Sequence, residues 1–365
     1  MKALTVGGAM IDTIAVIAND RIERMTMRNA DTSFLLLEEG RKNEAEDIST
    51  HCGGGAVNAA VSLARLGYDV SALVKLGQDT RADAILARLA DERVSTRYAV
   101  RDARAPTGAS VLIASHDRNA AVFTFRGANT LLEPHDLKPD AFACDLVYVS
   151  GLSNQSADHF PRIIEMAKAG GALVATNPGI RQLSARQGQF RDVIGKIDIL
   201  AVNRHEAGAL VPWLVSLNGE GGAALAPPSG EELPDLARQG FSSGGFELSL
   251  AGFCDGMRKL GPRWVVITDG RLGAYVGTPN GIFHCPPAPA VISGTAGAGD
   301  AFNSTFAAYI CEASDAEDAA IRAAVNASSV ISHLDTQTGL LRRPDLEART
   351  AASRDRLEIR RWNAA

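Results

Sequence analysis

The sequence has little that belongs to membranes, secretion or disulfide frameworks. None of its apolar runs approaches the roughly 20 residues that span a bilayer. Its first residues enter a strand-like run directly, without the apolar core and cleavage site of a signal peptide. The five cysteines are scattered and never spaced C-x-x-C, which is typical of reduced thiols. We therefore expect a cytoplasmic protein that does not act at a membrane.

Metal-binding and nucleic-acid-binding patterns are missing as well. The seven histidines form no H-E-x-x-H or similar pair, so the sequence gives no support to a zinc site. A net charge of −5 argues against a general nucleic-acid-binding protein. The partner that we expect is a small molecule.

Two nucleotide-binding fingerprints are also absent. A dinucleotide-dependent oxidoreductase needs G-x-G-x-x-G after the first strand, where this chain reads Gly7-Gly8-Ala9-Met10-Ile11-Asp12. No G-x-x-x-x-G-K-[ST] of a Walker loop occurs either. Neither the Rossmann nor the P-loop class of nucleotide site is therefore supported.

What the sequence does contain is an alternation of short β-branched runs and amphipathic segments. Strands that alternate with helices predict an α/β fold, with a three-layer, doubly wound, mostly parallel sheet covered on both faces. The predicted strands are 3–7, 70–75, 146–150, 173–176, 199–202 and 264–268, and the predicted helices are 57–66, 81–91, 158–167, 205–211 and 248–259.

Two kinds of segment interrupt this alternation. Residues 12–50 and 106–126 are predicted as strands without helices, so we assign them to a small β-sheet lid. Residues 217–245 are rich in Gly, Pro, Ser and Ala and predict a surface insertion. The predicted organisation is one α/β domain over residues 1–340, which carries the lid and the insertion, and a C-terminal helical tail at 341–365.

The strongest chemical signal is the stretch from Gly294 to Asp300, G-T-A-G-A-G-D, directly before an apolar helical run at 301–311. The backbone amides of Gly297, Ala298 and Gly299 would point outward at a helix N-terminus, where the helix dipole favours an anion. Asp300 beside that site is suited to take a proton from an attacking hydroxyl. The alternative is that Asp300 is an ordinary helix N-cap.

Two further stretches are suited to hold a polar ligand. The run G-G-G-A-V-N from Gly53 to Asn58 precedes a helix, lets a ligand approach the backbone, and offers the Asn58 amide as donor and acceptor. Asp12 follows the first strand, at the edge where parallel α/β sheets bind ligands. Plain helix entry and an exposed turn are the respective alternatives.

Two more stretches follow predicted strands. Asn203 and Glu206 share one helix face and are suited to hold Mg²⁺ through water, or else to form a capping box. The loop T-D-G-R-L-G from Thr268 to Gly273 fits either a hairpin turn or a nucleotide-contacting loop.

Taken together and in this order, these stretches resemble the ribokinase family, the phosphofructokinase-B family of carbohydrate and nucleoside kinases. The resemblance extends from Gly7 to about Gly339. It implies a ribokinase-like fold, ATP and Mg²⁺ as cofactors, and an alcohol acceptor on a sugar or a nucleoside. Lids of this family often form a dimer contact, so the resemblance also implies a homodimer through the β lid.

The same resemblance implies a role for each site residue. The family motif D-T-x-G-A-G-D carries an anion hole and a catalytic Asp, which implies catalytic roles for Gly297, Ala298, Gly299 and Asp300. Substrate binding is implied for Asp12, Gly53, Gly54 and Asn58. ATP binding is implied for Asn203, Glu206, Thr268, Gly270, Gly273 and Asn326, with Glu206 near the metal through water.

One position departs from the family pattern. The first Asp of the motif, which by resemblance helps to hold an activating monovalent cation, is Gly294 here. We therefore expect little or no dependence on K⁺. The acceptor stays open between a sugar and a nucleoside such as adenosine. A catalytically silent ligand-binding protein on the same scaffold is the alternative of another class, and the intact loop from Gly297 to Asp300 speaks against it.

Overall fold

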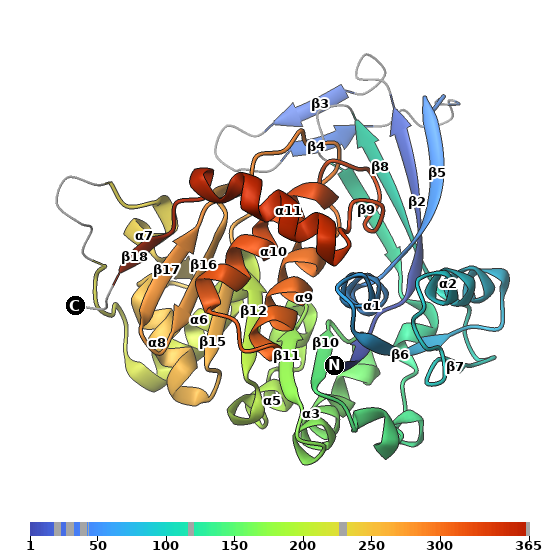
Figure 1. Ribbon diagram of the computed structural model, residues 1–365, viewed down its shortest axis with the longest axis horizontal. Helices are drawn as coiled ribbons and strands as arrows, with labels where there is room; N and C mark the ends of the chain where they lie inside the picture. The colour runs from blue at the N-terminus through green and yellow to red at the C-terminus, as the bar shows by residue number, and fades with distance from the viewer. Residues whose placement is uncertain are drawn as a thin grey trace.

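A computed structural model describes residues 1–17, 23–26, 33–36, 42, 44–115, 120–225 and 232–362. Within these residues a ten-stranded sheet runs through the molecule in the order β18-β17-β16-β15-β12-β11-β10-β1-β6-β7 (Figure 1). The strands from β7 across to β15 are parallel, and β16, β17 and β18 are antiparallel to their neighbours. The predicted α/β class with a mostly parallel sheet is confirmed. The strands are β1 (Lys2–Gly7), β6 (Asp69–Leu76), β7 (Val100–Arg101), β10 (Leu146–Ser150), β11 (Leu173–Asn177), β12 (Ile199–Asn203), β15 (Trp264–Thr268), β16 (Ala274–Thr278), β17 (Gly281–Cys285) and β18 (Arg360–Trp362).

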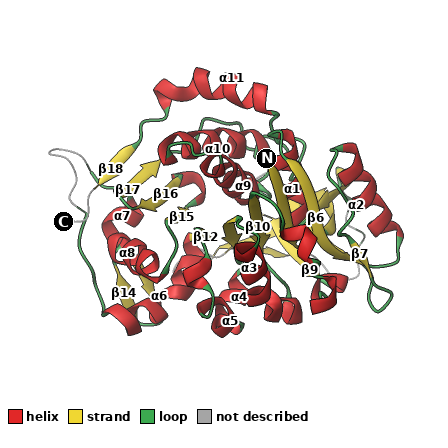
Figure 2. Ribbon diagram, turned by 60° about the horizontal axis from the view of Figure 1, so that its bottom comes forward, coloured by secondary structure: helices red, strands yellow, loops and turns green. Residues whose placement is uncertain are grey.

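Helices cover both faces of this sheet, as Figure 2 shows. One face packs against α1 (Gly55–Arg65), α2 (Thr80–Asp91), α9 (Ala298–Cys311) and α10 (Ala316–Val330). The other packs against α3 (Phe160–Ala169), α6 (Arg204–Asn218) and α8 (Leu250–Leu260). The remaining described helices are α4 (Ile180–Ala185), α5 (Gln187–Arg191), α7 (Asp235–Gln239) and α11 (Arg343–Ser353). None of the helices in the described part of the chain is long and apolar enough to cross a membrane.

The alternation of side chains along the strands explains the two cores. In β1, Ala3 points into the core with α1 and α9, whereas Leu4 and Val6 point into the core with α3 and α6. Leu4 and Val6 are fully buried. Each such burial contributes about 1.5–3 kcal/mol. A strand that is apolar on both faces is therefore stable only inside a three-layer fold.

A separate four-stranded sheet stands beside the carboxyl edge of the main sheet (Figure 1). Its order is β5-β2-β8-β9, with β5 (Asp47–Gly53), β2 (Met10–Ile17), β8 (Gly108–Ser115) and β9 (Ala120–Phe125). A two-stranded ribbon, β3 (Glu23–Thr26) with β4 (Ser33–Leu36), belongs to the same stretch of sequence. These strands fall in the two segments from which the lid was predicted. Residues 116–119, between β8 and β9, lie outside the described residues.

Part of the segment 217–245, which the composition predicts as a surface insertion, packs against the core. Described residues at its C-terminal end form α7 and the strand β13 (Phe241–Ser243), which pairs with β14 (Phe246–Leu248). Leu236 is fully buried, and the Phe241 ring lies 4.8 Å from that of Phe253. These apolar side chains pack this part of the segment against the core. Residues 226–231 lie outside the described part of the chain.

The segment 341–365 is also not a purely helical tail. After α11 the chain continues to β18, which pairs with β17 at the edge of the main sheet. Trp362 is only 3% exposed and its ring lies 6.5 Å from that of Tyr275. The edge strand β17 offers unpaired backbone groups, and β18 satisfies them. The α/β domain therefore extends beyond residue 340.

Candidate active site

Asp300 lies in the first turn of α9, at the carboxyl edge of the main sheet. The N-cap of this helix is Gly297 in a left-handed conformation with φ of 79°, so Asp300 is not the N-cap. A Cβ at residue 297 would come within 2.7 Å of the Thr336 Cβ, which reserves this position for glycine. The backbone amides at the start of α9 are therefore available to an anion beside the Asp300 carboxylate.

The carboxylate of Asp300 is half-buried and accepts a hydrogen bond from Asn58 Nδ2 at 2.8 Å. Burial raises the pKa of Asp300 above its ordinary value. The hydrogen bond from Asn58 offsets part of this rise, and the charge of Asp12 adds to it. A carboxylate with a raised pKa is a stronger base than an exposed one, as proton abstraction from a hydroxyl requires.

The orientation of Asn58 is fixed by two residues that the sequence motifs did not reveal. Thr336 Oγ1 and Gln337 Nε2 donate to Asn58 Oδ1 at 2.9 and 3.0 Å. Because both donors form hydrogen bonds with the Asn58 oxygen, the Asn58 amide nitrogen must face Asp300. Gln337 is itself oriented by Arg88, whose Nε donates to Gln337 Oε1 at 2.9 Å.

Asp12 lies on β2 of the lid, against the glycine run that precedes α1. Ser110 Oγ on β8 donates to Asp12 Oδ1 on β2, and burial is the largest cause of a raised pKa of Asp12. A Cβ on Gly53 would be 1.9 Å from Asp12 Oδ2, and a Cβ on Gly55 would be 3.3 Å from Asp300 Oδ1. The glycine run therefore passes between the two carboxylates, and its lack of side chains keeps the space open.

Asn203 and Glu206 form a capping box at the start of α6. Asn203 Oδ1 accepts from the Glu206 amide at 2.8 Å, and Glu206 Oε2 accepts from the Asn203 amide at 2.9 Å. Burial raises the pKa of Glu206, and the charge of Asp300 contributes to this rise. The capping alternative is thus realised, and the charge of Asp300 also acts on the Glu206 carboxylate.

A cavity of about 550 Å³ adjoins the start of α9. It lies between the loop that joins β15 to β16, the residues after β17, and α10. Its remaining wall, which the motifs did not identify, includes Pro287, Ala288, Phe302, Ala324 and Ala327 and is largely apolar. The predicted site residues that line it are Asn203, Thr268, Gly270, Gly273, Ala298 and Gly299.

Asn326 is not among the residues that line this cavity. It is fully buried, its Nδ2 donates to Thr305 Oγ1 at 2.8 Å, and its Oδ1 accepts from the Leu341 amide at 2.9 Å. Its neighbours on α10, Ala327 and Ser328, line the cavity instead. The amide of Asn326 is therefore occupied by hydrogen bonds within the protein.

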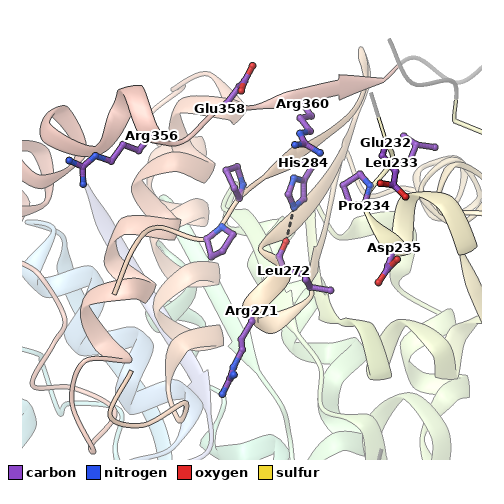
Figure 3. A pocket seen from close by; sticks show the side chains of 12 residues that line it. Glu232, Leu233, Pro234, Asp235, Arg271, Leu272, His284, Arg356, Glu358 and Arg360 are labelled. Carbon is purple, nitrogen blue, oxygen red and sulfur yellow. Dashed lines mark hydrogen bonds between the residues drawn. The ribbon is translucent and has the colours of Figure 1, made fainter. Parts of the chain in front are cut away.

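A larger cavity of about 750 Å³ lies on the other side of the same loop, and Figure 3 shows its lining. His284 points to the loop, where its Nε2 lies 2.7 Å from the Leu272 carbonyl oxygen. Arg271 lines both cavities. The larger cavity has no lining residue from the start of α9, whereas Ala298 and Gly299, next to Asp300, line the smaller one. The smaller cavity therefore adjoins the candidate site, and the size of the larger one does not make it the reaction site.

The fold and this site define a three-layer α/β phosphotransferase, in which a half-buried carboxylate lies between Asn58 and the wall of a nucleotide-sized cavity. A model of the pfkB family of carbohydrate kinases matches residues 18–214 and 252–343, and the chain belongs to this family. The family and the carbohydrate kinase activity predicted from the sequence are confirmed.

The chain is also similar to individual carbohydrate kinases. A deoxyribokinase of Salmonella typhi is 25% identical over 331 residues, which cover 89% of this chain and 94% of that protein. A fructokinase of Klebsiella pneumoniae is 29% identical over 266 residues, or 71% of this chain and 77% of its own length. The solved structure of Arabidopsis thaliana ribokinase complexed with ribose and ATP has a TM-score of 0.70 at 19% identity, covering 96% and 98% of the two chains.

Proposed function

We propose that this kinase transfers the γ-phosphate of ATP to a hydroxyl of a small sugar or sugar-like acceptor, with Asp300 as the general base. The observation that carries the proposal is the position of Asp300. Its carboxylate is held by Asn58, has a raised pKa, and adjoins both the free amides of α9 and the cavity of nucleotide size. Positioning and electrostatic stabilisation are what phosphoryl transfer requires.

On the acceptor side, Asp12 and the backbone at Gly53 and Gly54 are proposed to bind substrate hydroxyls. Asp12 has a free carboxylate oxygen over Gly53, which supports this role. Asn58 donates one amide hydrogen to Asp300 and keeps a second for a substrate oxygen. Asp300 then accepts the hydroxyl proton as the oxygen attacks the phosphorus, and the amides of Gly297, Ala298 and Gly299 stabilise the charge on the transferred group.

On the donor side, the apolar wall of the 550 Å³ cavity suits a planar base, and Thr268, Gly270 and Gly273 suit the ribose and phosphates. The described residues contain no cluster of three or more His, Cys, Asp or Glu that could hold a metal. We propose that Glu206 lies near Mg²⁺ through water, where the cation would neutralise phosphate charge. The raised pKa of Glu206 supports a place for a cation beside it.

The test is release of ADP with Mg-ATP over a panel of ribose, fructose, 2-keto-3-deoxygluconate and nucleosides such as adenosine. Asp300→Asn should lower kcat by about 10²–10⁴, the usual contribution of a placed base. A near-normal rate in this variant would contradict the assignment of the base. Turnover of nucleosides alone would select the nucleoside kinase alternative. Ligand binding without ADP release from any acceptor would favour the catalytically silent binding protein.

A further inference from the structure

Two arginines above the carboxyl edge of the sheet have no acidic partner. Arg126 follows β9 and is half-buried, and Arg181 lies on α4 and is exposed. In the part of the chain that the structure describes, neither forms an ion pair with a carboxylate. Asp158, on the adjoining segment, is paired with Arg186 at 3.0 Å instead.

The chain leaves the lid at Arg126, on the side of the lid that carries the proposed acceptor site. Asp12 pairs in register with Ser110, and Ser110 pairs with Thr124, two residues before Arg126. Side chains alternate along a strand, so Thr124 shares the face of Asp12, and Arg126 follows directly after the end of β9 at Phe125. Three residues further, Asn129 donates to and accepts from the backbone of Ala9 at 2.8 and 2.9 Å, which fixes this turn against the start of β2.

The loops that follow β10 and β11 bring Arg181 to the same place. A Cβ on Gly151 would be only 3.0 Å from the Gly179 amide nitrogen, so the two loops touch. Arg126 Nη1 donates to Ser153 Oγ at 3.2 Å. The turn η2 (Gly127–Thr130) and the helix α4 both pack on η5 (Asn154–His159), so all three segments meet.

The two positive charges act on each other. Burial lowers the pKa of Arg126, and the charge of Arg181 lowers it further. Uncompensated cations in a partly buried site are unfavourable, unless an anion is bound there in the working state. An arginine fork donates two parallel hydrogen bonds to a carboxylate or phosphate, which makes such an anion the natural ligand.

We infer that the acceptor of this kinase carries an anionic group, a carboxylate or a phosphate monoester, which Arg126 and Arg181 bind at the end remote from the hydroxyl that is phosphorylated. This inference rests on the proposed function, because it names the substrate class of the same site. The carboxylates of Asp300 and Asp12, by contrast, repel an anion. The substrate is therefore oriented by charge, with its neutral hydroxyl end toward Asp300.

The experiment compares acceptors that differ in this group. ADP release is measured with 2-keto-3-deoxygluconate, with a hexose monophosphate and with a neutral ketohexose. The expected result is a higher kcat/KM for one anionic acceptor than for the neutral sugar. The carboxylate and phosphate arms distinguish the two sources of the anion. A preference for the neutral sugar, with kinase activity intact, would overturn the inference and leave the proposed function standing.

Substitutions of single arginines test which residues produce the preference for an anionic acceptor. Arg126→Gln and Arg181→Gln should each lower the ratio of kcat/KM for the anionic over the neutral acceptor by about 10- to 100-fold, mainly through KM, as loss of a charge-assisted hydrogen bond does. Arg186→Gln removes an arginine that is already paired with Asp158 and should leave the ratio unchanged. An unchanged ratio in both site variants would overturn the inference.

Failure of the proposed kinase function can be distinguished from failure of the anion site. If no acceptor raises ADP release above that of Asp300→Asn, the kinase assignment for this panel fails. Binding of 2-keto-3-deoxygluconate and of the neutral sugar is then compared by calorimetry in the wild-type protein and in Arg126→Gln. If the wild-type protein binds 2-keto-3-deoxygluconate more tightly than the neutral sugar, and Arg126→Gln loses this difference, the anion site is supported. Equal binding of both sugars by the wild-type protein would overturn it.

Discussion

At the scale of single residues, Asn58 connects distant parts of the chain at the carboxylate that we propose as the base. Its oxygen accepts from Thr336 and Gln337, and its nitrogen donates to Asp300. The sequence predicted Asn58 and Asp300 as site residues, because each belongs to a glycine-rich stretch before a helix. It did not reveal Thr336 or Gln337, because no local pattern shows that residues nearly 280 positions apart share one hydrogen bond.

The first prediction concerns the acid side of the pH profile. Asp300 acts as a base only when it is deprotonated, so activity is lost as the pH falls through its pKa. Gln337→Met removes one of the donors that orient Asn58 and weakens the hydrogen bond that lowers the pKa of Asp300. The pKa should rise, and the acid limb of kcat/KM against pH should move to higher pH, while activity well above the pKa is largely retained.

A second substitution sharpens this test. Gln337→Glu should attract the Asn58 nitrogen, turn the Asn58 oxygen toward Asp300 and shift the limb further in the same direction. A purely structural role of Gln337 would lower activity at every pH without moving the limb, and that result would contradict the positioning role.

At the scale of elements, the loop before α9 is shaped by close backbone contacts. The Gly294 amide donates to the Ile331 carbonyl oxygen at 3.2 Å, and a Cβ at residue 294 would lie 2.9 Å from the His333 carbonyl oxygen. An aspartate would need these neighbours to move. The glycine that replaces the family Asp therefore fits the packing of this loop against the end of α10.

A prediction about monovalent cations follows from this loop. We expect the same rate in K⁺ as in a large organic cation at equal ionic strength, because residue 294 has no carboxylate to hold the ion. The measurement is the initial rate of ADP release at saturating Mg-ATP, with matched ionic strength to remove screening effects. Strong activation by K⁺ would show that other groups complete a cation site without this carboxylate.

At the scale of the whole molecule, the lid exposes an apolar surface on the face away from Asp12. Val111 pairs in register with Phe123, and Ala109 pairs with Phe125, so these side chains share one face. Val111, Phe123 and Phe125 are 44%, 61% and 51% exposed. Apolar surface of this kind on a short sheet commonly marks an interface, which supports the proposal that two lids pair in a homodimer.

The assembly prediction can be tested with a matched pair of variants. Phe123→Asp should convert the dimer to a monomer in light scattering after size exclusion, because a charge would be buried at the interface. Val122→Asp changes the adjacent residue, which is 57% exposed and points to the opposite face, and should leave the dimer intact. A monomeric wild-type protein, or a dimeric Phe123→Asp variant with an unchanged melting temperature, would rule out this interface.

The sequence by itself determined the alternation of the central strands and helices, and it indicated the stretches that are suited to carry the chemistry. Runs such as Leu146–Ser150 and Trp264–Thr268 became strands with these bounds, because an apolar run between turns has few other stable forms. Asp300, Asn58 and Asp12 were predicted because glycine-rich turns at strand ends are local features. These properties depend on neighbours in the chain.

Only the tertiary structure decided which side chains meet. It brought Gln337 to Asn58, occupied Asn326 with structural hydrogen bonds, and added β18 to the sheet. It also placed Arg126 and Arg181 together, although each reads in the sequence as an ordinary surface arginine. Hydrogen bonds and electrostatic interactions depend on distance in space, and loops that are far apart in sequence become neighbours only when the parallel strands align their carboxyl ends at one edge.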